Sequence, residues 1–242
     1  MEKARDMIQS SPSSPSSSHL TAFSESTHAL VPMNSIGPLK IIGPHMDDEV
    51  MVPLATYESP LWPSTNRGAK ATRLSGGVEA VLISAQMTRS ILVQAPNAAY
   101  AKDFLEHLKK QKETLKDIVA NTSRFAELID WHPQILGKMI YLRFALKTGD
   151  ASGHNMVTKA ADALLKWILE QYPDLKHLSV SGNFCVDKKV SAVNGILGRG
   201  KNVVAEVTIS KEICHDILKI TPEKIHDLNI KKNWMGSQLA GS

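Results

Sequence analysis

The stretch HNMVTKAADALLKWILEQY, residues 154–172, carries the clearest structural signal in the chain. Its apolar residues recur three or four positions apart and therefore fall on one face of a helix, and Pro173 follows directly and ends it. This apolar face consists of Met156, Val157, Ala160, Leu164, Trp167 and Ile168. The pattern predicts an amphipathic helix over residues 154–172 that buries this face in a core.

Strands and helices alternate around this helix. The expected elements are a strand at 90–94, a helix at 98–119, a strand at 138–146, the helix at 154–172 and a strand at 176–180. This β-α-β-α-β order is typical of a compact ferredoxin-like module over residues 90–180. The flanking segments 31–89 and 181–242 would then form a larger second domain from two separated pieces, so the expected fold class is α+β.

Shorter elements are expected outside this module. They are strands at 39–42 and 50–56, a strand or short helix at 78–88, a glycine-rich turn at 195–200, a strand at 202–209 and helices at 211–220 and 222–228. Periodicity cannot distinguish a helix from a strand over a run as short as 78–88.

Composition narrows the class of protein. The chain has 242 residues, of which 43% are hydrophobic, and this content excludes wholesale disorder. No apolar window is long enough to span a membrane. Two cysteines, Cys185 and Cys214, cannot form a disulfide framework, which favours a reducing, cytoplasmic location. The net charge of +4 indicates anionic ligands and does not require nucleic acid.

The N-terminus differs from the rest of the chain. Residues 10–18 read SSPSSPSSS, a composition that cannot build a core. The segment lacks the basic and apolar regions of a secretory signal. We therefore expect residues 1–30 to be a disordered leader.

The run PHMDDE, residues 44–49, has two interpretations. It is similar to the PHxDDE signature of zinc-dependent sugar deacetylases, in which His and Asp ligate the metal. The alternative is a solvated acidic hairpin between two strands. We favour the hairpin and predict no metal site.

Two neighbouring motifs suggest ligand chemistry. PSTNRG, residues 63–68, reads as a turn in which Ser64, Asn66 and Arg67 cradle an anion, or as an ordinary polar loop. Glu58 lies just before it among apolar residues, where a desolvated carboxyl could donate a proton. An exposed glutamate is the alternative.

Two further motifs lie beside the best helix. GDASGHN, residues 149–155, precedes the helix, so Asp150 is either a cap or part of a phosphate site at the helix N-terminus. SGNFCVDKK, residues 181–189, gathers a hydroxyl, a carboxylate and two ammonium groups in one loop. An ammonium aimed at a carbonyl stabilises the oxyanion that develops there. A surface charge run is the alternative.

Taken together, these stretches resemble the 3-hydroxy-3-methylglutaryl-CoA reductase family in its class I form. The matching stretches are VPMNSIGPL (31–39), VPLATYESPLWPSTNRG (52–68), MTR (87–89), TSRF (122–125), RFALKTGDASGHNM (143–156), SVSGNFCVDKKVSAVNGILGRGK (179–201) and NIKKNWMGSQLAGS (229–242). They follow the family order and cover about residues 31–242. The family reduces hydroxymethylglutaryl-CoA to mevalonate and CoA with two NADPH, through a hemithioacetal and an aldehyde.

The resemblance implies a role for each matched residue. Lys188 corresponds to the catalytic lysine that polarises the carbonyl, and Glu58 to the glutamate that donates a proton. The residues that match positions holding the hydroxymethylglutaryl group are Arg89, Ser181, Asp187, Lys189 and Lys232. Those that match CoA contacts are Ser64, Asn66, Arg67 and Lys219. Those on the NADPH side are Ser123, Arg124, Phe125, Asp150, Gly153 and Asn155.

The chain also departs from the family pattern. Ser152 and His154 replace two methionines, and His154 beside the cofactor phosphates would add a pH-dependent charge. ESTHA, residues 25–29, stands where the family has its ENVIG dimerisation segment. The sequence stops at LAGS, before the family's GQD aspartate, its CoA-protonating histidine and a glycine-rich nucleotide loop, so we expect a C-terminally truncated reductase.

Three functions follow from these comparisons of motifs. The leading one is an NADPH-dependent hydroxymethylglutaryl-CoA reductase, which in a complete chain would be a homo-oligomer built from dimers. The alternatives are an inactive remnant that still binds CoA and nucleotide, and the zinc-dependent deacetylase. Neither nucleic acid nor a membrane is an expected partner.

Overall fold

The computed structural model describes residues 29–239. The serine-rich segment, most of ESTHA and the terminal Gly241-Ser242 lie outside the described residues. The strands are β1 (Met33–Gly43), β2 (Met46–Ala55), β3 (Val78–Gln94), β4 (Glu127–Leu136), β5 (Met139–Lys147), β6 (Lys176–Ser179) and β7 (Gly200–Glu206). The α-helices are α1 (Leu61–Leu74), α2 (Ala98–Lys109), α3 (Lys112–Ala120), α4 (His154–Gln171), α5 (Ala192–Leu197), α6 (Lys211–Ile213), α7 (Pro222–Leu228) and α8 (Ser237–Leu239). Two π-helical segments, η1 (Cys214–Leu218) and η2 (Asn229–Gly236), complete the list.

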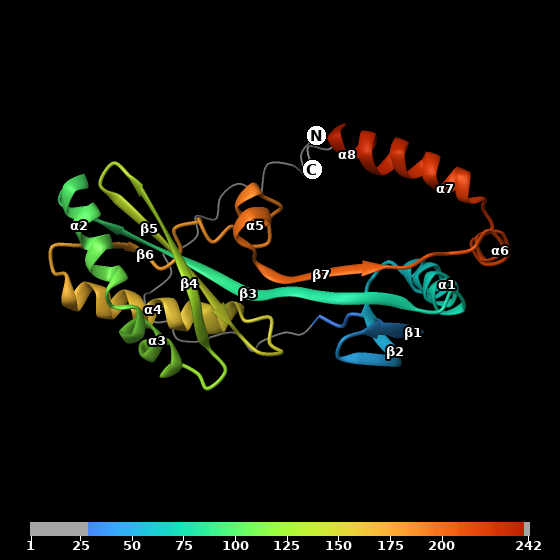
Figure 1. Ribbon diagram of the computed structural model, residues 1–242, viewed down its shortest axis with the longest axis horizontal. Coiled ribbons are helices and arrows are strands. Elements are labelled where there is room, and N and C mark those ends of the chain that lie inside the picture. Colours follow the sequence, from blue (N-terminus) through green and yellow to red (C-terminus); the bar gives the residue numbers. More distant parts are fainter. Residues whose placement is uncertain (1–28, 240–242) are drawn as a thin grey trace, which may run out of the picture.

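The 17-residue strand β3 runs through the whole mixed α+β structure (Figure 1). Its first half pairs with β1 in parallel and with β7 antiparallel, and its second half pairs with β5 and β6, both antiparallel. The sequence predicted a strand at 90–94 and left 78–88 open between helix and strand. The two segments are one continuous strand, rich in the β-branched and aliphatic residues that strands favour.

The second half of β3 belongs to a four-stranded antiparallel arrangement in the order β4-β5-β3-β6. The helix at 154–172 and the strands at 138–146 and 176–180 are confirmed within one or two residues. β4 was not predicted, because Pro133 and several polar residues obscure its pattern. A proline is tolerated there because β4 is an edge strand.

The predicted helix at 98–119 is instead two helices. The N–H of Lys110 bonds the carbonyl of His107 and the N–H of Gln111 that of Leu108, each at 3.0 Å. These bonds to the third preceding residue tighten the chain and interrupt the α-helix between α2 and α3. Both helices still bury apolar side chains, such as Leu108 and Leu115.

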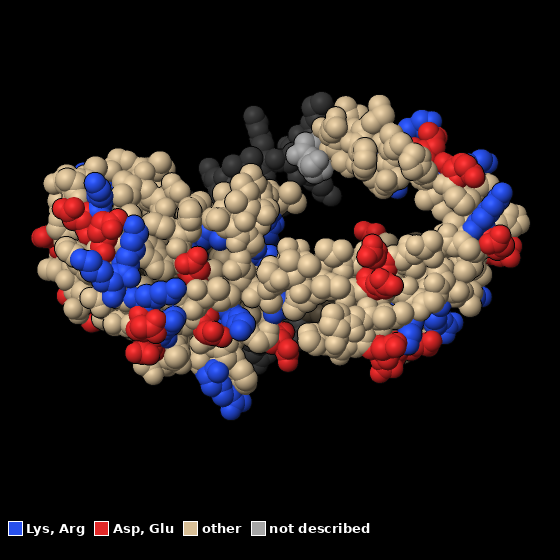
Figure 2. Space-filling view, viewed as in Figure 1, with Lys and Arg blue, Asp and Glu red and all other residues tan. Residues whose placement is uncertain are grey.

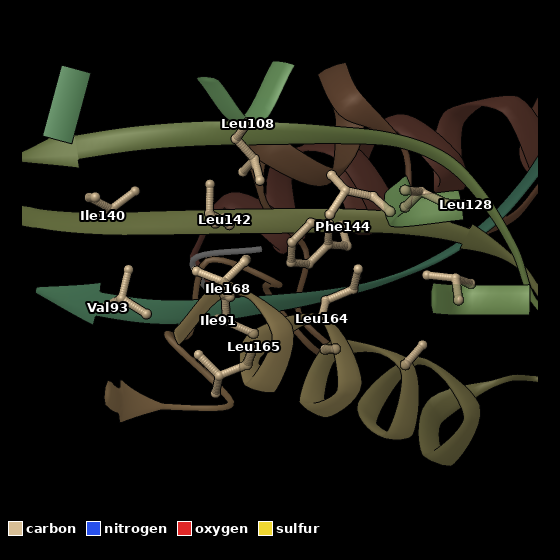
Figure 3. Close-up of a cluster of buried hydrophobic side chains, with 14 of the residues drawn as sticks. Ile91, Val93, Leu108, Leu128, Ile140, Leu142, Phe144, Leu164, Leu165 and Ile168 are labelled. Carbon is tan, nitrogen blue, oxygen red and sulfur yellow. The ribbon is translucent and has the colours of Figure 1, made fainter. Parts of the chain in front are cut away.

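The hydrophobic core lies between this antiparallel half of the sheet and α2, α3 and α4. Figure 3 shows strand residues such as Ile91, Leu142 and Phe144 facing Leu164 and Ile168 of α4, and all five are fully buried. The apolar face predicted from the sequence is therefore the face that α4 packs inward. Burial of each such side chain contributes about 1.5–3 kcal/mol.

The other half of the molecule is thinner. The β1–β2 hairpin and β7 flank the first half of β3, and α1 packs on β1. Large apolar side chains of β3 and β7 remain exposed here, namely Val81, Leu82, Ile83, Val203 and Val204. The helices expected at 211–220 and 222–228 are present, although a π-helical turn ends the first and the second continues through η2 to Leu239. Figure 1 shows α7 to α8 as a rod that stands apart from the sheet.

The surface charge is mixed. Blue and red side chains intermingle over α2, α3 and α4 in Figure 2, and they do not form one basic patch on this face. Among residues 29–239, no helix combines the length and apolarity needed to cross a membrane.

The location of the core predicts which substitutions lower the free energy of unfolding. We expect Phe144→Ala to lower the free energy of unfolding by about 3–5 kcal/mol, because it leaves a cavity between β5 and the helices. Val203→Ala removes an exposed side chain and should change it by less than about 0.5 kcal/mol. Urea unfolding followed by circular dichroism measures both. A similar loss for the two variants would contradict this location of the core.

Candidate functional site

A cluster of polar side chains lies where β3 passes from one half of the sheet to the other. Arg89 projects from β3 toward α4, as does Phe144, its register partner on β5. Its Nη1 donates to Ser181 Oγ at 3.3 Å and its Nη2 to Thr158 Oγ1 at 2.6 Å. Arg89 and Ser181 were both predicted as site residues, and the fold brings them into contact over 92 positions of sequence.

Asp187 lies in the loop that follows Ser181. Its Oδ1 accepts a hydrogen bond from Arg199 Nη2 in an ion pair, and the Arg199 side chain is only 10% exposed. The same oxygen lies 3.5 Å from Nε2 of His154, the first residue of α4. The sequence predicted His154 beside cofactor phosphates, and in the structure its ring also lies beside the carboxylate of Asp187.

A second arginine occupies the opposite face of the sheet. Arg143 of β5 is 2% exposed, and its Nη2 donates to Asn194 Oδ1 at 3.3 Å and to the Gly198 carbonyl at 2.9 Å. Burial lowers the pKa of this guanidinium, and the neighbouring charge of Arg199 lowers it further. Arg143 and Asn194 were not predicted as site residues. For Arg143, the sequence did contain a signal, which is a single arginine inside the apolar strand YLRFAL.

Asn194 also holds the loop that carries the two lysines. Its Nδ2 donates to the carbonyls of Val186 at 3.0 Å and of Lys189 at 2.9 Å. Val186 has φ +48° and Lys188 has φ +57°. Left-handed backbone is strained, most of all at a β-branched residue such as valine. The loop is thus fixed in a strained shape that leaves Lys188 and Lys189 exposed.

The segments predicted for the nucleotide side gather around the start of α4. A Cβ on Gly149 would lie 4.0 Å from Phe125 Cδ1, and Lys159 of α4 donates to the Thr122 carbonyl at 2.9 Å. Arg124 lies over the Phe125 ring, 4.7 Å from its centroid. Phe125, Asp150 and Asn155 are exposed, and Ser123 is half-buried.

Gly153, and not Asp150, is the N-cap of α4, and no side chain caps this helix. Gly153 has φ +87°, and a Cβ on it would lie 2.4 Å from Thr148 Cγ2, so only glycine fits. Among the described residues, no side chain accepts a hydrogen bond as the N-cap of this 18-residue helix. A helix N-terminus with free N–H groups favours anions.

The PSTNRG motif is not a turn, because Ser64, Asn66 and Arg67 lie inside α1. Prolines are tolerated in the first turn of a helix, and Pro63 is in that turn. Ser64 Oγ donates to the Leu61 carbonyl at 3.0 Å, and Asn66 Oδ1 accepts from the Gly37 N–H at 2.8 Å. The exposed Arg67 is the member of the set most open to an external anion.

The remaining predicted residues lie on other elements. Glu58, in the turn before α1, is exposed, which is the second of the two possibilities that the sequence left open. Lys219 follows η1, which packs against α1. Lys232 is exposed on η2, in the rod that stands apart from the sheet. The central cluster therefore does not include these three residues.

The PHMDDE run forms the acidic hairpin. His45 is in the β1–β2 turn, Asp47 pairs with Lys40, and Glu49 lies 3.7 Å from Arg73. No group of three or more metal-ligating side chains occurs between residues 29 and 239. The zinc-dependent deacetylase interpretation has no support in this geometry.

The fold is that of an α+β protein. Its site places arginines and lysines around one loop, next to the N-terminus of a helix. Such an arrangement suits the binding of anionic ligands. The family model of hydroxymethylglutaryl-coenzyme A reductase matches residues 11–242, and the chain belongs to this family.

Curated relatives agree with the family model. The chain is 46% identical over 213 residues to the 3-hydroxy-3-methylglutaryl-coenzyme A reductase of Pyrococcus abyssi, covering 88% of this chain and 52% of that one. It is 44% identical to reductase 2 of Dictyostelium discoideum, covering 85% of this chain and 40% of that one. The chain thus spans about half the length of such relatives, or less.

The fold has solved counterparts. A class II 3-hydroxy-3-methylglutaryl-CoA reductase from Streptococcus pneumoniae, bound to NADPH, superposes with a TM-score of 0.59 at 18% identity. The match covers 79% of this chain and 49% of that chain. At this identity the likeness supports the shared fold alone.

The role of Asn194 can be tested by stability. We expect Asn194→Ala to lower the free energy of unfolding by about 1–3 kcal/mol, because the buried Arg143 and two loop carbonyls lose a partner. The exposed Asn121 is the matched control, and Asn121→Ala should change it by less than about 0.5 kcal/mol. Chemical unfolding compares the two. An equal loss of unfolding free energy in the two variants would show that the contacts of Asn194 do not stabilise the loop.

Proposed function

We propose that this chain carries part of an NADPH-dependent hydroxymethylglutaryl-CoA reductase, which forms mevalonate and CoA for isoprenoid synthesis. The observation that carries the proposal is the contact of Arg89 with Ser181, beside Asp187 and the lysine loop. The resemblance to the reductase family matches Arg89, Ser181 and Asp187 to positions that hold the hydroxymethylglutaryl group. Family membership supports the same reaction.

We infer a division into two domains. Residues 90–180 would be a small ferredoxin-like, NADP(H)-binding domain, and residues 31–89 and 181–242 the larger CoA-substrate domain. The strand order β4-β5-β3-β6 with helices on one face supports the first. The boundary between them falls inside β3, so one continuous strand would join the two domains.

The loop lysines supply the chemistry at the acyl group. Lys188 would place its ammonium against the thioester carbonyl and stabilise the negative charge that develops on oxygen. Arg89, Ser181, Lys189 and Lys232 would bind the carboxylate and hydroxyl of the hydroxymethylglutaryl group, and Asp187 would orient the lysine. The strained backbone of the loop keeps Lys188 turned outward before any ligand binds.

The start of α4 fits a dinucleotide phosphate. Its uncapped N–H groups, the guanidinium of Arg124 and the exposed ring of Phe125 offer anion binding and a stacking surface. Ser123, Asp150, Gly153 and Asn155 would complete the NADPH site. NADPH, when bound, supplies the hydride for each of the two reduction steps.

The surface around α1 would bind the CoA part of the substrate. Arg67, with Ser64, Asn66 and Lys219, would bind CoA phosphates, and the packing of η1 on α1 supports this grouping. Glu58, at the start of the same helix, would donate a proton to the reduced oxygen. Its exposed carboxyl would become desolvated when the substrate covers it.

We also infer a cytoplasmic homo-oligomer. Cys185 and Cys214 are both free and buried, which suits a reducing compartment. The exposed apolar residues of β3 and β7 support burial against another polypeptide surface.

The function is tested by binding and by turnover. We expect the purified chain to bind hydroxymethylglutaryl-CoA and NADPH by calorimetry. Where it also oxidises NADPH with this substrate, Lys188→Ala should reduce the rate about 10²–10³-fold. Lys176→Ala, on exposed β6, is the matched control and should have no effect. If the chain binds the ligands without turnover, it is an inactive remnant that retains the binding sites. If it binds neither hydroxymethylglutaryl-CoA nor NADPH, the proposal is contradicted.

A further inference from the structure

The first turns of α4 contact both sides of the candidate site. Thr158 Oγ1 accepts a hydrogen bond from Arg89 Nη2 at 2.6 Å and donates to the His154 carbonyl at 2.9 Å. Because the hydroxyl is fixed by its own helix, it offers the guanidinium an acceptor in a defined place. The same guanidinium then reaches Ser181 Oγ through its other terminal nitrogen.

Arg89 depends on this contact for its orientation. Its Nε is buried and has no hydrogen-bond partner among residues 29–239. The two terminal nitrogens therefore carry the polar contacts described for this side chain, one to Thr158 and one to Ser181. Without the Thr158 hydroxyl, only the longer 3.3 Å bond to Ser181 would hold the guanidinium.

His154, one helical turn earlier, lies beside the second group, the carboxylate of Asp187. Residues four apart lie on the same helix face, so His154 and Thr158 both face the loop after β6. The His154 Nε2 is buried and lies 3.5 Å from Asp187 Oδ1, and within the described part of the chain it makes no hydrogen bond. The same Asp187 oxygen accepts the hydrogen bond from Arg199.

We propose that Thr158 and His154 are positioning residues that set the affinity of the site for the hydroxymethylglutaryl group through Arg89 and Asp187. This inference rests on the proposed function. Neither residue would touch the substrate. The helix that presents its N-terminus to the nucleotide also orients, through the next turn, two groups that bind the acyl moiety.

The test compares ligand affinities of Thr158 variants. Thr158→Val keeps the shape of the side chain but removes the acceptor, and the bond lost is to a charged group. We expect it to weaken hydroxymethylglutaryl-CoA binding about tenfold or more and to leave NADPH binding unchanged. Thr158→Ser keeps the hydroxyl and should restore most of the affinity. Isothermal titration calorimetry on the 242-residue chain measures both ligands.

Two controls separate positioning from folding. Thr114→Val removes a different helical hydroxyl, that of Thr114 in α3, which donates to the side chain of Gln111. It should not change the affinity for either ligand. His154→Leu should weaken hydroxymethylglutaryl-CoA binding in the same direction as Thr158→Val, and His154→Gln, which keeps a donor, should weaken it less.

The outcomes are distinct. Unchanged hydroxymethylglutaryl-CoA affinity in Thr158→Val, or an equal loss for both ligands, would overturn the inference and leave the proposed function standing. Failure of the unsubstituted chain to bind either ligand would overturn the proposed function, and the positioning role with it.

Discussion

The structure depends on one uninterrupted strand, β3, which is hydrogen-bonded to different partner strands in its two halves. The first half of β3 pairs with β1 and β7, and its second half with β5 and β6. Along residues 80–91 β3 pairs with one strand at a time, with β7 up to Gln86 and with β5 from Met87 onward. Arg89 lies just past the change of partners, which is why its guanidinium can contact both α4 and the loop after β6.

The two arginines on this strand pair are stabilised in different ways. Arg143 is enclosed among Asn194, Gly198 and Arg199, and its burial is tolerated because carbonyl and amide oxygens accept from it. Arg89 keeps partial exposure and bonds two hydroxyls, so it retains capacity for an incoming carboxylate. One arginine therefore maintains the fold of the lysine loop, while the other remains available to a ligand.

The sequence allowed the antiparallel half to be predicted because α4 has a complete apolar face and a proline that ends it. β4 was missed because an edge strand requires little hydrophobic alternation, and α1 was missed because prolines at its start read as a turn. The loop residues Ser181 and Asp187 followed from a specific motif. Thr158 and Asn194 could not be predicted, because an ordinary threonine or asparagine gains its role only from a partner distant in sequence.

The acidic hairpin has a consequence for the behaviour of the molecule in solution. β2 forms one end of the sheet, and its outer edge offers unpaired backbone groups to any second strand. Asp47, Asp48 and Glu49 place exposed carboxylates along the beginning of this strand. A second copy that paired in parallel along this edge would bring these carboxylates together, and the contacts with Lys40 and Arg73 would offset only part of the repulsion, so the charges disfavour growth of the sheet into a fibril-like assembly.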